Sequence, residues 1–228
     1  MPGKTAVAAL ALLLAAAPLR AQVPAPFPRG ETVERVAARS DPTQSYALYL
    51  PSGYDPSRRW PVLFLMDPRG RALVPLRLFR AAAERHGYAV LSSYDTRSDS
   101  AAAMELNPRG LEAMLQDAQQ LLAPDTRRVY LAGFSGTARA AWTFGYQLRD
   151  HVAGVVGFGA GLPPGAGALL AAGAADPPFA FFGGAGATDF NAQEVRTLAA
   201  ALERLGFPHH VDIYPGPHAW PPEEVCAA

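Results

Sequence analysis

The sequence predicts an α/β domain in which helices cover both faces of a mostly parallel sheet. Continuous apolar runs of strand length occur at 61–66 and 129–132, as expected for strands buried on both faces. Helical segments separate these runs, most clearly at 111–122, where the apolar residues fall on one helix face. The chain has 228 residues, 50% of them hydrophobic, which is enough for one full core.

Strands and helices are expected to alternate along the chain. The expected strands are 32–38, 45–51, 61–66, 88–93, 129–132, 151–158, 179–182 and 210–214. The expected helices are 73–86, 107–123, 136–148, 168–172 and 191–205. The first two strands suit an antiparallel edge pair. No internal repeat, second-domain linker or insertion long enough for a lid domain interrupts this order.

Capping patterns predict where two of the helices start. Asn107 followed by Pro108 predicts an N-cap with proline at the first helical position. Asn191, with Glu194 three residues later, predicts a capping box.

The first residues have the pattern of a targeting segment. Lys4 precedes an apolar stretch of Ala and Leu, and a small-residue cleavage site follows at Ala21. We therefore expect a signal peptide at 1–21, a flexible leader at 22–30 and a single domain at 31–228. This pattern predicts export without stable membrane insertion after cleavage. The high Ala, Pro and Arg content suggests a bacterial source, so we expect a periplasmic or secreted protein.

Composition excludes some classes of function. The formal net charge is +0, and no basic run or phosphate-binding glycine motif occurs, so a nucleic-acid partner is not expected. Cys226 is the only cysteine. It cannot form an internal disulfide, and we do not expect it to be a nucleophile.

Ser135 lies where an expected strand turns directly into an expected helix. The segment Gly133-Phe134-Ser135-Gly136-Thr137 nearly matches the Gly-x-Ser-x-Gly nucleophile elbow of the α/β-hydrolase superfamily, which the chain resembles here. Such a turn exposes the hydroxyl, and the helix N-terminus behind it favours negative charge. Thr137 departs from the pattern, because a branched side chain stands where the motif has glycine. A glycine-rich turn in an ordinary parallel sheet is the alternative interpretation.

A serine nucleophile needs a base and a group that orients the base. His218 is the candidate base, because it follows the last strand and so lies at the same sheet edge as Ser135. Asp189 is the candidate orienting carboxylate for the same reason, with capping of the next helix as its alternative role. The order Ser135, Asp189, His218 is the order found in α/β-hydrolases.

An oxyanion hole requires two N–H groups near the reacting carbonyl. Gly136, directly after the serine, is expected to supply one. The loop after the strand at 61–66 is expected to supply the second, and since Pro68 has no N–H, the candidate is Arg69.

Several segments together resemble serine esterases related to esterase D, feruloyl esterases and polyhydroxybutyrate depolymerases. The matching segments are 49–51 and 53–54 ahead of 61–63, 132–136, 186–189 and 216–220. The resemblance covers nearly all of the chain after the targeting segment. It implies hydrolysis of a small-molecule or polymeric carboxylic ester by a Ser-His-Asp triad, without a metal or cofactor.

Two alternatives remain open at this point. The same triad would serve a peptidase or thioesterase, because no segment defines a substrate pocket. The chain could instead be a non-catalytic binding protein on the same fold, a reading that rests on Thr137 and on the C-terminus. Ten residues follow His218, where the family usually places a further helix, so we expect one sheet face to be thinly covered.

Overall fold

The structure is a computed structural model that describes residues 27–163, 165–166 and 179–227. The expected signal peptide at 1–21, most of the expected leader and the expected short helix at 168–172 lie outside the described residues. The connection between the strand that ends at Phe158 and the strand that begins at Ala180 is described only in part. The expectation that no lid domain is present falls largely outside the described residues there.

Eight strands form one sheet in the order β1-β2-β4-β3-β5-β6-β7-β8. Their bounds are Thr32–Ala37 (β1), Ser45–Tyr49 (β2), Trp60–Met66 (β3), Ala89–Ser93 (β4), Pro124–Phe134 (β5), Gly154–Phe158 (β6), Ala180–Gly186 (β7) and His209–Tyr214 (β8). The β1–β2 and β2–β4 pairs are antiparallel, and the other pairs are parallel. The predicted mostly parallel sheet with an antiparallel N-terminal edge is therefore confirmed.

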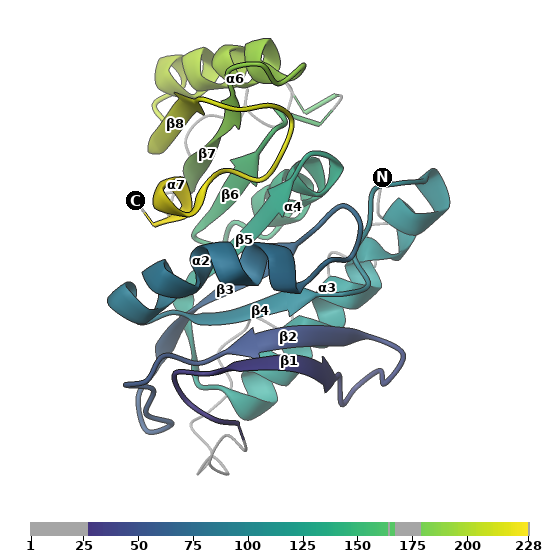
Figure 1. Ribbon diagram of the computed structural model, residues 1–228, viewed down its shortest axis with the longest axis vertical. Helices are drawn as coiled ribbons and strands as arrows, with labels where there is room; N and C mark the ends of the chain where they lie inside the picture. Colours follow the sequence, from purple (N-terminus) through teal and green to yellow (C-terminus); the bar gives the residue numbers. More distant parts are fainter. Residues whose placement is uncertain (1–26, 164, 167–178, 228) are drawn as a thin grey trace.

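Helices lie on both faces of this sheet (Figure 1). The described helices are Leu73–His86 (α2), Ala101–Leu121 (α3), Gly136–Gln147 (α4), Ala192–Arg204 (α6) and Glu223–Cys226 (α7). Alternate β3 side chains point to opposite faces: Phe64 joins a core with α3, α4 and α6, whereas Leu65 joins a core with α2 and α7. All seven β3 residues are buried, which explains the continuous apolar run in the sequence.

Helix α3 begins earlier than predicted. Ser100 is its N-cap and accepts a hydrogen bond from the Ala103 N–H, so Pro108 lies inside the helix. Asn107 does not cap the helix. Its buried side chain accepts from the Arg97 N–H at 2.7 Å and donates to the Arg97 carbonyl at 2.8 Å. The predicted start was wrong because this amide binds a distant backbone segment that the local pattern does not reveal.

Helix α6 begins after Asn191, as expected, but no capping box forms. The Asn191 side-chain amide donates to the Gly159 carbonyl at 2.8 Å instead of bonding its own helix. The Glu194 carboxylate pairs with Arg139 of α4 at 2.6 Å. Both side chains therefore join α6 to neighbouring elements rather than to its own first turn.

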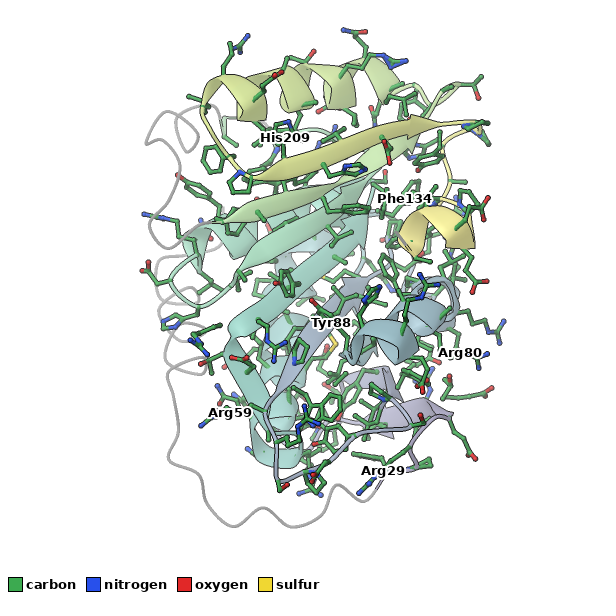
Figure 2. The ribbon with its side chains drawn as sticks, turned by 90° about the vertical axis from the view of Figure 1, so that its left-hand side faces the viewer. Arg29, Arg59, Arg80, Tyr88, Phe134 and His209 are labelled. Atoms are coloured by element: carbon green, nitrogen blue, oxygen red, sulfur yellow. The ribbon has the colours of Figure 1, made fainter. Side chains whose placement is uncertain are left out.

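Among the described residues after β8, helix formation is limited to the single turn α7, which packs against α2. Beside them lies an apolar cavity of about 430 Å³, lined by residues of α2, α7 and the strands β5 to β8. Figure 2, turned by 90° from Figure 1, labels two of the residues that line this cavity, Tyr88 and His209. This cavity lies on the face that α2 and α7 cover, and the thin cover of one sheet face expected from the sequence stays a prediction.

The topology places a crevice at the end of two central strands. β3 leads into α2 on one face, and its neighbour β5 leads into α4 on the other face. Adjacent parallel strands whose helices leave to opposite faces open a crevice at their carboxyl ends, where ligands bind in such sheets. The loop that begins at Asp67 and the turn at Ser135 both lie at this point.

Candidate active site

Ser135 forms a strained turn between β5 and α4. Its φ of 55° makes it the only non-glycine residue with positive φ among those the structure describes. Its N–H donates to the Phe158 carbonyl at 2.8 Å, which fixes the turn to β6. Gly133 permits the turn, because a Cβ there would lie 2.5 Å from the Thr137 carbonyl carbon. The predicted strand-to-helix corner is therefore present.

Thr137 fits the elbow although its motif position is normally glycine. Its side chain is fully buried, and Oγ1 lies 2.7 Å from the Met66 carbonyl and 2.8 Å from the Phe134 carbonyl. The Phe134 N–H donates to the same oxygen at 3.2 Å. The branched side chain is buried between the ends of β3 and β5, and it ties the elbow to the end of β3.

The structure brings the three predicted triad side chains together. His218 Nε2 lies 3.0 Å from Ser135 Oγ, and His218 Nδ1 lies 2.8 Å from Asp189 Oδ2. With Nδ1 protonated and donating to the carboxylate, Nε2 has a free lone pair that can accept the serine proton. This is the geometry that a serine nucleophile requires of its base and orienting group.

Asp189 is held by its own backbone surroundings. Its side chain is 0% exposed, and its second oxygen, Oδ1, accepts from the Asn191 N–H at 2.7 Å. The carboxylate therefore also holds the N–H of Asn191, the residue at the N-cap position of α6, which is close to the alternative role considered for it. Both roles are compatible because each uses a different oxygen.

The loop that carries His218 packs closely on the end of β7. The Gly216 carbonyl accepts from the Thr188 N–H at 3.0 Å. A Cβ on Gly186 would lie 2.5 Å from the Pro217 carbonyl oxygen and still closer to that of Gly216. Glycine is required at this position because the backbone of the histidine loop occupies the space of a side chain.

Two phenyl rings flank the imidazole of His218. The ring centroid of Phe134, which is buried, lies 4.7 Å away, and that of Phe190 lies 4.1 Å away. Phe190 is 77% exposed, so burial in the core does not account for its position. The two rings limit the orientations that the imidazole can adopt.

Asp67 joins the loop after β3 to the histidine loop. Its buried carboxylate accepts from Trp220 Nε1 at 2.9 Å, from Arg71 Nε and Nη2 at 3.0 Å, and from the Arg69 N–H at 2.9 Å. Burial alone would raise the pKa of this carboxyl. The hydrogen bonds outweigh burial and hold its pKa below the ordinary value, so Asp67 is ionised at neutral pH.

The two predicted oxyanion donors differ in their surroundings. Gly136 is the first residue of α4, so its N–H has no acceptor within the helix. The Arg69 N–H, predicted as the second donor, is instead engaged by Asp67 Oδ1. The Arg69 N–H thus already has an acceptor in its own loop, a contact that the local sequence did not reveal.

A cavity of about 600 Å³ opens over Ser135 and His218, with Arg69, Ser98, Leu78 and Trp220 among its walls. No group of three or more potential metal ligands occurs in the described part of the chain. Over the same residues, no helix is both long and apolar enough to cross a membrane. Cys226 lies away from this cavity, and burial raises the pKa of its thiol to about 12, which makes it a poor nucleophile.

No protein family model and no curated protein matches the sequence. Solved structures do match. The S-formylglutathione hydrolase of Staphylococcus aureus superposes with a TM-score of 0.63 at 17% identity, over 85% of this chain and 92% of that chain. The feruloyl esterase module of Clostridium thermocellum, complexed with sinapinate, superposes with a TM-score of 0.64 at 17% identity, over 90% of this chain and 87% of that chain. A fluorophosphonate-binding serine hydrolase of Staphylococcus aureus superposes with a TM-score of 0.63 at 16% identity, over 84% of this chain and 93% of that chain.

The chain has the α/β-hydrolase fold. This fold places the residue after β5 at the nucleophile elbow, the loop after β7 at the acid and the loop after β8 at the base, which are the positions of Ser135, Asp189 and His218. Identities this low show the fold and leave the chemistry of the site to be argued from its own residues.

Sequence reasoning missed the contributions of three residues to this α/β-hydrolase site. Asp67 follows a buried strand directly, so the strand-end rule that selected Asp189 also points to it. Trp220 lies in the same loop as His218, so the strand-end rule that selected His218 also points to it. Ser98 had no local signal, because its place beside Gly136 depends on the path of the segment after β4.

Proposed function

We propose that the protein is a serine hydrolase that cleaves a carboxylic ester through an acyl-enzyme intermediate. The observation that carries this proposal is the continuous hydrogen-bond chain from Ser135 Oγ through His218 to the buried Asp189 carboxylate. The likeness to solved feruloyl and ferulic acid esterases supports an oxygen ester as the substrate, whereas the substrate named for the S-formylglutathione hydrolase is a thioester and supports that alternative.

The geometry supports the following reaction. Ser135 Oγ attacks the ester carbonyl carbon while its proton passes to His218 Nε2, and the carbonyl oxygen becomes an oxyanion near the Gly136 N–H. When the intermediate collapses, the C–O bond to the leaving alcohol breaks and the alcohol takes the proton from Nε2. A water molecule then attacks the acyl-enzyme and gives a proton to Nε2. The carboxylic acid leaves, and the proton returns to Ser135.

Asp189 stays ionised through this cycle and stabilises the imidazolium formed in each half. The Nδ1–Oδ2 hydrogen bond also holds the ring in the tautomer that leaves Nε2 free to accept a proton. The strained φ of Ser135 and the two flanking rings at His218 fix the attacking geometry before substrate arrives.

The test is turnover of p-nitrophenyl acetate and butyrate by the purified chain lacking residues 1–21. We expect Ser135→Ala to lower kcat by at least about 10³-fold and to abolish labelling by a fluorophosphonate probe. Ser40→Ala is the matched control, because Ser40 is exposed and lies far along the chain from the elbow. Unchanged turnover in Ser135→Ala would overturn the proposal. A folded protein with neither turnover nor labelling would favour the non-catalytic binding protein.

Thioester and peptide substrates use the same triad chemistry, so parallel assays with a p-nitrophenyl ester, a matched thioester and an anilide decide between them. We expect the ester to have the highest kcat/KM. A higher kcat/KM for the thioester or the anilide would reassign the substrate class and leave the triad in place.

We also propose that the protein is exported from a bacterial cell. This rests on Lys4, the apolar stretch after it and the small-residue site at Ala21. Expression of the full chain in a bacterium, followed by mass spectrometry of the periplasmic fraction, should give an N-terminus at Gln22. Full-length protein confined to the cytoplasm would contradict this proposal.

A further inference from the structure

In the first part of the loop after β3, residues 68–71, no backbone N–H is free for an oxyanion. Pro68 has no N–H, and the N–H groups of Arg69 and Arg71 both donate to Asp67 Oδ1, at 2.9 and 3.2 Å. The Gly70 N–H donates to the Asp67 carbonyl at 3.1 Å. Asp67 is fully buried and ionised, so releasing one of these bonds would leave a buried charge less well paired.

Ser98 lies against the Gly136 side of the elbow. A Cβ added to Gly136 would lie 2.5 Å from Ser98 Oγ, so the hydroxyl occupies the space directly beside the Gly136 backbone. The Ser98 N–H donates to the Pro68 carbonyl at 3.0 Å. Ser98 is thus fixed between the loop after β3 and the first residue of α4, and it lines the same cavity as Ser135 and His218.

Two further contacts hold the segment that carries Ser98. Arg97 forms an antiparallel bridge with Arg69. The side-chain amide of buried Asn107 binds both the N–H and the carbonyl of Arg97, at 2.7 and 2.8 Å. The backbone of this segment is therefore preorganised, although it belongs to a loop.

The Ser98 hydroxyl is available as a donor. Within the described part of the chain, no acceptor is hydrogen-bonded to its Oγ, and the residue is partly exposed toward the cavity. A hydroxyl can rotate its proton toward an acceptor without moving the backbone. Serine side chains are among the groups that can form an oxyanion hole.

We propose that the Ser98 hydroxyl is the second donor of the oxyanion hole and acts together with the Gly136 N–H. The hydroxyl would donate the hydrogen bond that the Arg69 N–H, already bound to Asp67 Oδ1, does not supply. This inference rests on the proposed hydrolase function, because it assigns a donor to the oxyanion formed when Ser135 attacks.

The test compares Ser98→Ala and Ser98→Thr with the wild-type protein on p-nitrophenyl butyrate. Loss of one oxyanion donor lowers kcat by roughly 10²- to 10³-fold. We expect Ser98→Ala to show about a 10²-fold lower kcat with KM changed less than about threefold, because the donor acts on the transition state. Ser98→Thr keeps a hydroxyl at the same carbon and should recover most of this loss.

A second measurement separates a donor from a structural residue. A trifluoromethyl ketone forms a tetrahedral adduct with Ser135 whose oxygen mimics the oxyanion. For Ser98→Ala, its inhibition constant should rise by about the same factor as kcat falls, while circular dichroism and the urea midpoint stay at wild-type values.

Three results would overturn the inference. The first is that the wild type is active and the kcat of Ser98→Ala lies within threefold of the wild-type kcat. This result would leave the hydrolase proposal intact. Another is an equal loss in Ser98→Ala and Ser98→Thr with a lowered urea midpoint, which would show a structural role. The third is a folded wild type without turnover or labelling, which would remove the proposed function as well.

Discussion

Trp220 Nε1 donates a hydrogen bond to Asp67 Oδ2 at 2.9 Å, across 153 positions of sequence. This contact joins the loop after β3, at one side of the elbow, to the loop that carries His218 at the other side. The two loops follow strands that are not neighbours in the sheet, so no strand pairing fixes their separation. A buried carboxylate with four other hydrogen bonds makes the connection rigid.

Replacing this carboxylate should give a pH-dependent loss of stability. Hydrogen bonds to a charged group contribute about 2 kcal/mol each, so we expect Asp67→Asn to lower the free energy of unfolding by about that amount at pH 7. The folded-state pKa of Asp67 lies below its ordinary 3.8, so the carboxylate stabilises the protein above about pH 4. This contribution is lost as the pH falls through the folded-state pKa.

Urea unfolding of wild type and Asp67→Asn at pH 7 and pH 3 tests this prediction. The difference in the free energy of unfolding between wild type and Asp67→Asn should be smaller at pH 3 than at pH 7. Asp99→Asn is the control, because Asp99 is 52% exposed and its pair with Arg97 is long, at 3.8 Å. An Asp67→Asn variant as stable as wild type at pH 7 would contradict the prediction.

Thr137 should be needed for stability even though the motif has glycine at its position. Thr137→Val keeps the shape but leaves the Phe134 N–H without its side-chain acceptor in a buried site. We expect it to cost about 1–3 kcal/mol of unfolding free energy, measured by urea titration. Thr137→Ser keeps the hydroxyl and should cost less. If serine were the worse substitute, packing of the methyl group rather than the hydrogen bonds would be responsible.

The close approach of the histidine loop to β7 predicts a selective loss of activity in Gly186→Ala. The new Cβ would meet the Gly216 and Pro217 carbonyl oxygens, so the loop must shift and carry His218 away from Ser135. We expect kcat to fall at least about tenfold, since displacement of a catalytic group by about 1 Å costs about 10²-fold. Gly53→Ala, whose Cβ would meet no atom within 4 Å, should have wild-type kcat. Equal activity in both variants would exclude the proposed crowding.

Phe190 allows a test of the flanking rings that leaves the core unchanged. Because its side chain is 77% exposed, Phe190→Ala should change the free energy of unfolding by no more than about 0.5 kcal/mol. We expect kcat to fall several-fold, because the His218 ring loses the contact on one of its sides. Thermal unfolding and initial rates measure the two effects. A destabilised variant with wild-type kcat would show that Phe190 serves the fold instead.

Local patterns predicted most of the strands and helices, because the buried residues of each element recur along the chain with the period of a strand or a helix. The run at 61–66 became β3, and Gly87, with φ of 71°, ends α2 as expected. The start of α3 could not be predicted in this way. Asn107 has good capping chemistry, but its amide binds Arg97, and Ser100 caps the helix instead.

The sequence by itself determined the order of strands and helices, the parallel sheet and the three candidate residues at its carboxyl edge. It could do so because burial follows a local period, and because the ends of parallel strands meet at one edge. Only the tertiary structure decided how the site is completed. The bonds of Asp67 to Trp220 and the Arg69 N–H, and the placement of Ser98 beside Gly136, depend on where separate loops cross in space, which no local period encodes.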